Sequence, residues 1–114
     1  MMIEGKRYQQ AASVFRILSH PARLRIVDEL RRGEASVCRL QAILHRRQPY
    51  VSQQLIILRE AGIAGSRRDG QFIYYYLEDE GLEHVLEAAL GPARRPTHPA
   101  SHTCPFCREQ DLAS

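Results

Sequence analysis

Apolar residues recur at three- and four-residue spacing in five segments of the chain, which is the pattern of helices with one buried face. These predicted helices span residues 8–18, 21–32, 37–44, 49–61 and 82–90. Three of them begin at residues typical of helix starts, since Pro21 and Pro49 suit a first turn and Ser36 is a good N-cap. Gly33 and Gly62 follow two of the helices, where glycine commonly ends a helix. The pattern predicts a mostly helical domain.

The pattern changes to that of a β-hairpin between the fourth and fifth predicted helices. Residues 63–68 and 71–77 flank Asp69-Gly70, and Asp-Gly between two short runs is a strong hairpin signal. The second run, FIYYYL, is rich in the aromatic and β-branched residues that strands prefer. A short helix, a tight turn, a longer helix and then a hairpin are the elements of a winged helix-turn-helix. We expect residues 1–90 to form this domain and residues 91–114 to form a Pro-rich tail.

The net charge of +3 is unevenly distributed along the chain. Residues 1–77 contain 13 Lys and Arg against 6 Asp and Glu, a balance of +7. Residues 78–90 contain five acidic residues and no basic one, a balance of −5, and the tail adds +1. The basic first part suits a polyanionic partner, although ordinary solvated surface charge explains the same balance.

The predicted helix at 49–61 is in the position of a recognition helix, whose N-terminal residues meet base edges in the major groove. Its tip is polar and uncharged, and this suits base reading because Gln forms paired hydrogen bonds to adenine and Ser bonds to base or phosphate. The candidate DNA contacts are the tip, the basic turn before it and the basic wing: Arg46, Arg47, Gln48, Tyr50, Ser52, Gln53, Gln54, Arg67 and Arg68. Each alone is explained equally well as a polar side chain that faces solvent, but together they predict double-stranded operator DNA as the partner.

Other classes of protein fit the sequence less well. The chain has no run of about 18 apolar residues for a membrane span, and MMIEGKRYQQ lacks the apolar centre of a signal peptide, so we expect a cytoplasmic protein. No Gly-rich phosphate loop, paired-carboxylate site or nucleophile elbow indicates an enzyme. A winged-helix interaction module that does not bind DNA remains an alternative, because fold does not fix function.

Residues 10–90 resemble the ArsR/SmtB family of bacterial metalloregulatory repressors. The resemblance rests on ILSHPARLRIVDEL in the second helix and on VSQQLIILREAGIAGSRRDGQFIYYYL across the fourth helix and the hairpin. It implies a homodimer packed through the first and last helices, and repression by operator binding that an effector relieves. The amphipathic helix at 82–90 agrees with such a dimer, although its apolar stripe also suits packing within its own chain.

The family's effector sites match this sequence only in part. Its thiolate sensors often have a Cys-Val-Cys pattern in the third helix, where this chain has Ser36-Val37-Cys38. Its zinc-type sensors use Asp and His at the start of the last helix. Asp79 matches the first of these ligands, but Gly81 stands where the resemblance places the His. We therefore predict no zinc-type site on the last helix.

The three cysteines are the candidate sensor residues. Cys104 and Cys107 form a CPFC motif in the tail, and Cys38 lies in the third predicted helix. Together they would form a three-thiolate site for As(III), Sb(III), Cd or Zn, which makes a repressor released by a thiophilic metal or metalloid the first hypothesis. The alternatives are a disulfide or polysulfide link formed on oxidation, one zinc held by the tail cysteines of two protomers, and no effector role.

Overall fold

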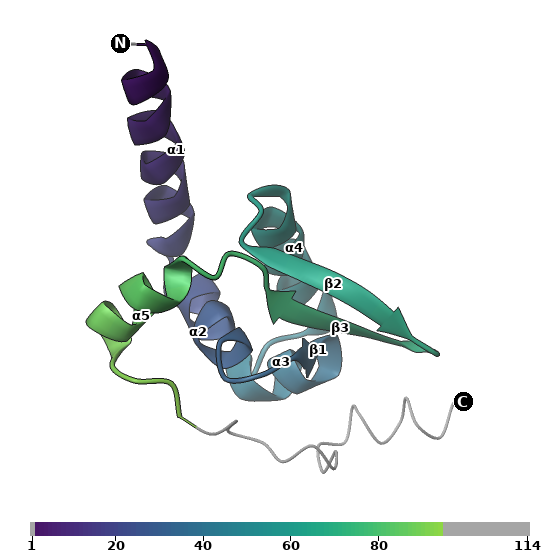
Figure 1. Cartoon of the computed structure of the whole chain (residues 1–114). Coiled ribbons are helices and arrows are strands. Elements are labelled where there is room, and N and C mark those ends of the chain that lie inside the picture. The colour runs from purple at the N-terminus through teal and green to yellow at the C-terminus, as the bar shows by residue number, and fades with distance from the viewer. Residues whose placement is uncertain (1, 95–114) are drawn as a thin grey trace.

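The computed structural model describes residues 2–94, with side chains described for residues 5–94. In this part of the chain, helices pack against a small three-stranded sheet whose hairpin extends outward (Figure 1). The elements in chain order are α1 (Met2–Leu18), α2 (Pro21–Leu30), β1 (Ala35–Ser36), α3 (Val37–Leu44), α4 (Gln48–Glu60), β2 (Ala64–Asp69), β3 (Phe72–Leu77) and α5 (Leu82–Leu90). The predicted mostly helical domain with a β-hairpin is confirmed.

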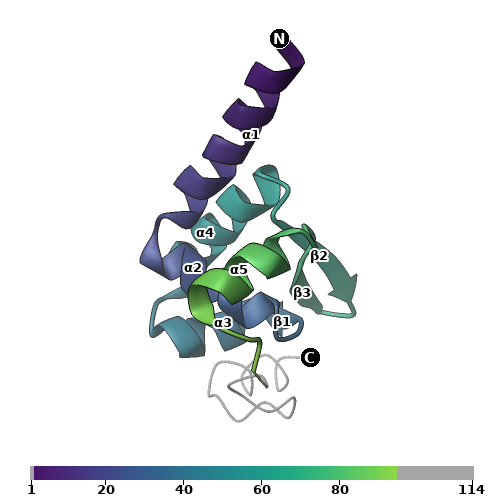
Figure 2. The same cartoon turned by 60° about the vertical axis from the view of Figure 1, so that its left-hand side comes forward.

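The first helix extends away from the rest of the domain (Figure 2). Its last turns reach the body, where Leu18 is buried and Val14 and Ile17 pack against the core. The helix begins at Met2 and not in the region of residue 8 as predicted, because its polar first half has no apolar stripe to reveal it. None of the described helices is long and apolar enough to cross a membrane.

One apolar core joins α2, α3, α4, α5 and the sheet. Burial of a large aliphatic side chain contributes about 1.5–3 kcal/mol to folding, so this cluster fixes how α3 and α4 lie relative to the hairpin. The largest side chains at its centre are less than 2% exposed: Ile26, Leu40, Leu55, Leu58, Ile63 and Leu86.

The two-residue strand β1, which the sequence analysis did not predict, joins the segment after α2 to the hairpin. Ala35 pairs with Tyr75 and Ser36 with Tyr74, so the sheet has the antiparallel order β1-β3-β2. Ser36 is also the N-cap of α3, as predicted, since its Oγ accepts a hydrogen bond from the Arg39 backbone N–H at 3.4 Å. Two residues are too few to show the alternation that marks a strand.

The turn of the β2–β3 hairpin lies one residue later than predicted. Asp69 pairs with Phe72, so the loop residues are Gly70 and Gln71 and not Asp69 and Gly70. Gly70 has a φ of +64°, and a positive φ at the first loop residue is the feature of a type II′ turn that favours glycine. The wing therefore extends through Asp69.

Gly65 provides the surface on which a tyrosine of the neighbouring strand packs. Gly65 pairs directly with Tyr76, and a Cβ placed on Gly65 would lie 2.5 Å from Tyr76 Cζ. The ring thus covers the strand where a side chain is missing, an arrangement that compensates for glycine in a sheet.

We predict that Gly65→Ala lowers the free energy of unfolding by about 1 kcal/mol or more, because the Tyr76 ring must move or the strand must bend. Urea unfolding followed by circular dichroism measures this change. In a Tyr76→Thr background the new methyl group meets no ring, so the same substitution should be neutral or slightly stabilising. Equal destabilisation in both backgrounds would show that the ring is not the cause.

Candidate nucleic-acid interface

The segment from α3 to α4 has the geometry of a helix-turn-helix. The chain leaves α3 at His45, which adopts the left-handed conformation (φ 55°, ψ 43°) while its backbone N–H donates to the Gln41 carbonyl. Such a conformation is uncommon outside glycine. It redirects the chain within a short turn, after which α4 begins at Gln48. The packed core then holds α4 with its first turn at the surface.

Most residues of the predicted reading tip lie where a ligand can reach them. Gln48 and Gln53 are exposed, and Tyr50 and Ser52 are half-buried. No side chain caps the start of α4, where Arg47 is the N-cap residue. Backbone N–H groups at such a helix start attract phosphate. The tip thus offers both side-chain and backbone donors to a nucleic acid.

Gln54 lies away from this tip. Its side chain is buried, and its Oε1 accepts a hydrogen bond from Arg23 Nε at 2.8 Å. Arg23 Nη1 also donates to the Ile17 carbonyl at 3.3 Å, so this contact joins α4 to α2 and α1. Gln54 follows Val51 by three residues and therefore shares its buried helix face. We remove Gln54 from the candidate base contacts.

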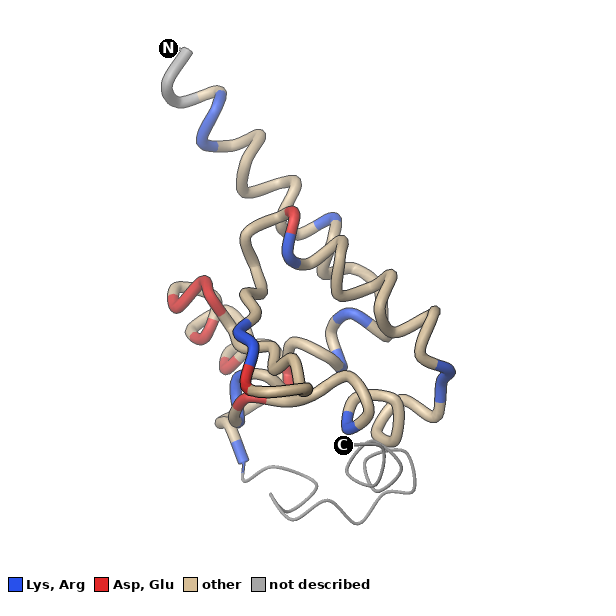
Figure 3. Tube along the Cα trace, turned by 90° about the vertical axis from the view of Figure 1, so that its right-hand side faces the viewer, with Lys and Arg blue, Asp and Glu red and all other residues tan. Residues whose placement is uncertain are grey.

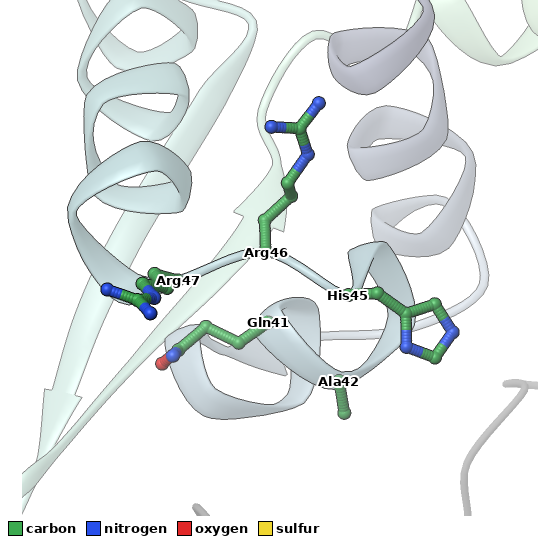
Figure 4. Close-up of a pocket in the computed structure, with 5 residues that line it drawn as sticks. All are labelled: Gln41, Ala42, His45, Arg46 and Arg47. Carbon is green, nitrogen blue, oxygen red and sulfur yellow. The ribbon is translucent and has the colours of Figure 1, made fainter.

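The two arginines of the turn point in different directions (Figure 4). The guanidinium carbon of Arg46 lies 4.5 Å from the centroid of the Tyr50 ring, a cation–π contact that places Arg46 beside the start of α4. Arg46 and Arg47 are both exposed and border a cavity of about 540 Å³ at the end of α3. Its other described lining residues are Gln41, Ala42 and His45. Both arginines are accessible to a phosphate from solvent, and their role as positioning contacts stays a prediction.

The two arginines of the wing differ in their partners. Arg67 donates from Nε and Nη2 to the two carboxylate oxygens of Glu34, each at 2.8 Å. Its Nη1 lies 3.8 Å from Asp69 Oδ2, and its guanidinium carbon lies 4.9 Å from the Tyr74 ring centroid. Arg68 is exposed, points to the opposite face of the strand and has no ion-pair partner among the described residues.

Glu34 is the residue of this surface that the sequence analysis missed. Its hydrogen bonds with Arg67, aided by the positive charge, lower the pKa of the Glu34 carboxyl below its ordinary value, and the same contact raises the pKa of Arg67. Both side chains are therefore charged at neutral pH. The two residues are 33 positions apart, and no local pattern relates them. The pairing of β3 with both β1 and β2 brings them together across the sheet.

Acidic residues gather away from this surface, on the last helix. Among its residues α5 has Glu83 and Glu87 and no Lys or Arg, and Figure 3 shows this acidic segment at one side of the molecule. The charged residues that are unevenly distributed along the sequence are therefore also unevenly distributed in space. The α3–α4 turn has Arg46 and Arg47 on the surface where the recognition tip lies.

Cys38, the second residue of α3, is 1% exposed. Its Sγ lies 3.2 Å from the Oγ of Ser36, the residue that caps the same helix. The structure has the Cys38 sulfur in a disulfide bond. Cys104 and Cys107, the other two cysteines of the sequence, lie outside the described residues.

The predicted metal site falls mostly outside the described residues, since Cys38 is its only member within them. Across residues 5–94, no group of three or more His, Cys, Asp or Glu side chains is placed to hold a metal ion. Asp79 Oδ1 accepts a hydrogen bond from the Gly81 backbone N–H at 3.1 Å, and so takes part in the turn before α5. A thiolate metal site at Cys38 would need ligands from the tail or from a second protomer.

Comparison with known sequences agrees with this geometry. Residues 20–66 match the family model described as bacterial regulatory protein, arsR family. The biofilm growth-associated repressor of Agrobacterium fabrum is 45% identical over 83 residues, which are 73% of this chain and 71% of that protein. A cadmium resistance transcriptional regulatory protein CadC homolog of Staphylococcus aureus is 35% identical over 80 residues, 69% of this chain and 66% of that protein. These relatives are regulators and not enzymes, as predicted.

Solved structures show the same fold. Reduced HlyU from Vibrio cholerae superimposes with a TM-score of 0.72 at 26% identity, over 77% of this chain and 93% of that chain. A homodimeric winged helix-turn-helix DNA-binding domain of Mycobacterium bovis, described as a possible ArsR-family regulator, superimposes with a TM-score of 0.70 at 26% identity, over 75% of this chain and 80% of that chain. The predicted winged helix-turn-helix is confirmed, and the chain belongs to the ArsR/SmtB family of DNA-binding transcriptional repressors.

Proposed function

We propose that this chain is a homodimeric repressor that leaves its operator when Cys38 is oxidised to a disulfide. The observation that carries the proposal is the position of the Cys38 sulfur, which is disulfide-bonded and lies 3.2 Å from the capping hydroxyl of α3. In this proposal residues 1–90 bind DNA and form the dimer, and residues 91–114 supply the second sulfur. The similar HlyU structure is described as that of the reduced protein, which is consistent with a redox-sensitive member of this fold.

DNA binding is assigned to the first turns of α4 and to the wing. Gln48, Tyr50, Ser52 and Gln53 would meet base edges, because they are the accessible polar residues of a helix shaped for the major groove. The candidate phosphate contacts are Arg46, Arg47, Arg67 and Arg68. A duplex of operator DNA is the partner that this arrangement suits.

The homodimer is supported by apolar side chains that the single chain leaves uncovered on α1 and α5. Tyr8 and Phe15 are 64% and 56% exposed, and Val85 and Leu90 are 38% and 46% exposed. The predicted stripe on α5 is divided, since Leu82 and Leu86 are buried within the chain while Val85 and Leu90 face outward. A second copy would cover these surfaces, and the similar M. bovis domain is described as homodimeric.

Oxidation at Cys38 would affect both DNA-reading elements. Two thiols, those of Cys38 and a tail cysteine, lose two hydrogens and form one S–S bond, while a peroxide takes up the electrons and protons and becomes water. The sulfur contacts Ser36, which caps α3 and pairs with Tyr74 of the wing strand. A change in the bonding of the Cys38 sulfur would therefore shift Ser36, and with it the positions of α3 and the wing strand. Oxidised and reduced chains would then have different affinities for DNA.

A thiophilic metal or metalloid remains a second candidate effector, favoured by the similarity to a cadmium resistance regulator. Cys38, Cys104 and Cys107 would hold As(III), Sb(III), Cd or Zn through thiolates. Thiolate binding needs reduced cysteines, whereas the disulfide uses the same sulfur atoms. The two effectors therefore exclude each other at Cys38.

We predict that reduced wild-type protein is released from DNA by hydrogen peroxide and that Cys38→Ser and Cys104→Ser/Cys107→Ser are not. Fluorescence anisotropy on a labelled duplex from the promoter of its own gene measures release, and dithiothreitol should restore binding. The same titration with sodium arsenite tests the second candidate. Release by arsenite alone, requiring all three cysteines, would replace the redox proposal with the metalloid one.

We predict that Arg68→Gln weakens operator binding and makes its salt dependence shallower by about 0.9 in the slope of log K against log salt, as for one lost phosphate contact. Arg59→Gln is the matched control, because Arg59 is exposed at the far end of α4. Equal effects of the two substitutions would contradict a wing contact. A wild-type chain that binds no duplex would instead indicate an interaction module.

We predict that Phe15→Glu/Val85→Glu converts the dimer to a folded monomer, because two buried charges would face the partner copy. Sedimentation equilibrium at micromolar concentration measures the mass, and circular dichroism checks the fold. Ile73→Glu is the control, since Ile73 is 41% exposed on the wing strand and should leave the dimer intact. A dimer that survives the double substitution would exclude these helices as its interface.

A further inference from the structure

The ion pair between Glu34 and Arg67 occupies the part of the arginine that binds phosphate. Arg67 uses Nε and Nη2 together, and both carboxylate oxygens of Glu34 accept at 2.8 Å. Phosphate binds an arginine through the same planar fork, so carboxylate and phosphate compete for one set of donors. The third nitrogen, Nη1, lies 3.8 Å from Asp69 Oδ2.

The pair also removes net charge from the wing. Glu34 cancels the charge of Arg67, and Asp69 adds a negative charge beside it. The Tyr74 ring lies under the guanidinium, with its centroid 4.9 Å from Arg67 Cζ, and this contact helps to hold the side chain beside β3. Among the described residues of the wing, Arg68 alone then presents an uncompensated positive charge to DNA.

We propose that Glu34 is an internal competitor of DNA phosphate for Arg67, so that the wing gains its second phosphate contact only when this ion pair opens. The inference rests on the proposed function in one respect, namely that the wing binds DNA. Glu34 is thus a residue that sets affinity without itself binding DNA, and Arg67, a candidate DNA contact from the sequence, is a conditional contact.

Exposure of the pair makes the competition possible. The side chains of Arg67 and Glu34 are 48% and 40% exposed, so a phosphate can approach the guanidinium from solvent. An exposed ion pair contributes little to stability and opens readily. A buried pair in this place would hold Arg67 permanently, whereas this one yields to a backbone that presents a phosphate in the same position.

The position of Glu34 in the chain places the competing carboxylate close to Cys38. Glu34 directly precedes β1, and β1 ends at Ser36, whose hydroxyl contacts Cys38 Sγ. The carboxylate that holds Arg67 therefore lies at one end of a short segment, and the Cys38 sulfur lies at its other end. The placement of Glu34 relative to the wing is fixed by the pairing of this segment with β3.

A double-mutant cycle on the full-length, reduced protein tests the proposal. The four proteins are the wild type, Glu34→Gln, Arg67→Gln and the double variant, each titrated by anisotropy on the promoter duplex at several salt concentrations. We expect Glu34→Gln to tighten binding about twofold to fivefold and to steepen the salt slope by about 0.9, because Arg67 becomes free for a phosphate. In the Arg67→Gln background the same change should have a smaller effect on affinity and leave the slope unaltered.

Glu78→Gln is the matched control, because Glu78 is exposed just beyond the wing and its removal changes net charge equally. Equal tightening by Glu34→Gln in both backgrounds, or by Glu78→Gln, would overturn the proposal in favour of general charge removal. Weaker binding by Glu34→Gln would overturn it by showing that Glu34 presents Arg67 to DNA. If the wild-type protein does not bind the promoter duplex, both the proposed function and this inference are contradicted.

Discussion

The pairing of β1 with β3 is the constraint on which the DNA-binding surface depends. Ala35 is 1% exposed and pairs with Tyr75, and Ser36 pairs with Tyr74 while it caps α3. Two residues thus join the wing to the helix-turn-helix. A two-stranded hairpin alone has little stability in water, but a third strand and a packed core hold its direction. The relative position of recognition helix and wing is therefore set by this short strand.

The positive charge that the DNA-binding surface offers depends on the local contacts of each arginine. The basic residues of the sequence suggest one positive surface, yet in the structure Arg67 faces a carboxylate, Arg23 holds an amide in the interior and Arg46 packs on an aromatic ring. Charge that is counted from the sequence is therefore larger than the charge offered to DNA. What a phosphate meets depends on which of these contacts it can displace, and the exposed ones yield first.

Sequence reasoning recovered the elements whose signals are local. The span of α3 was predicted from residue 37 to residue 44, because its cap and apolar spacing lie within a few positions. Features that depend on distant partners were missed, namely β1, the Glu34 contact and the burial of Gln54. Gln54 shows the reason, since a polar residue on a helix is exposed or buried according to what packs beside it. For Gln54 that neighbour is Arg23 of α2, which the sequence alone does not place.

The same dependence on distant partners explains why a buried cysteine suits a switch. At 1% exposure the Cys38 sulfur is shielded from bulky reagents, so its chemistry is limited to small oxidants, small thiophilic ions and sulfur atoms that the fold itself delivers. Close packing also means that the forming or breaking of the disulfide at this sulfur cannot be absorbed locally, because neighbouring atoms have little free volume into which to move. Ser36 must respond to such a change, because its Oγ lies 3.2 Å from Cys38 Sγ. Since Ser36 belongs both to the cap of α3 and to the sheet, in the proposed switch that response would reach the recognition helix and the wing together.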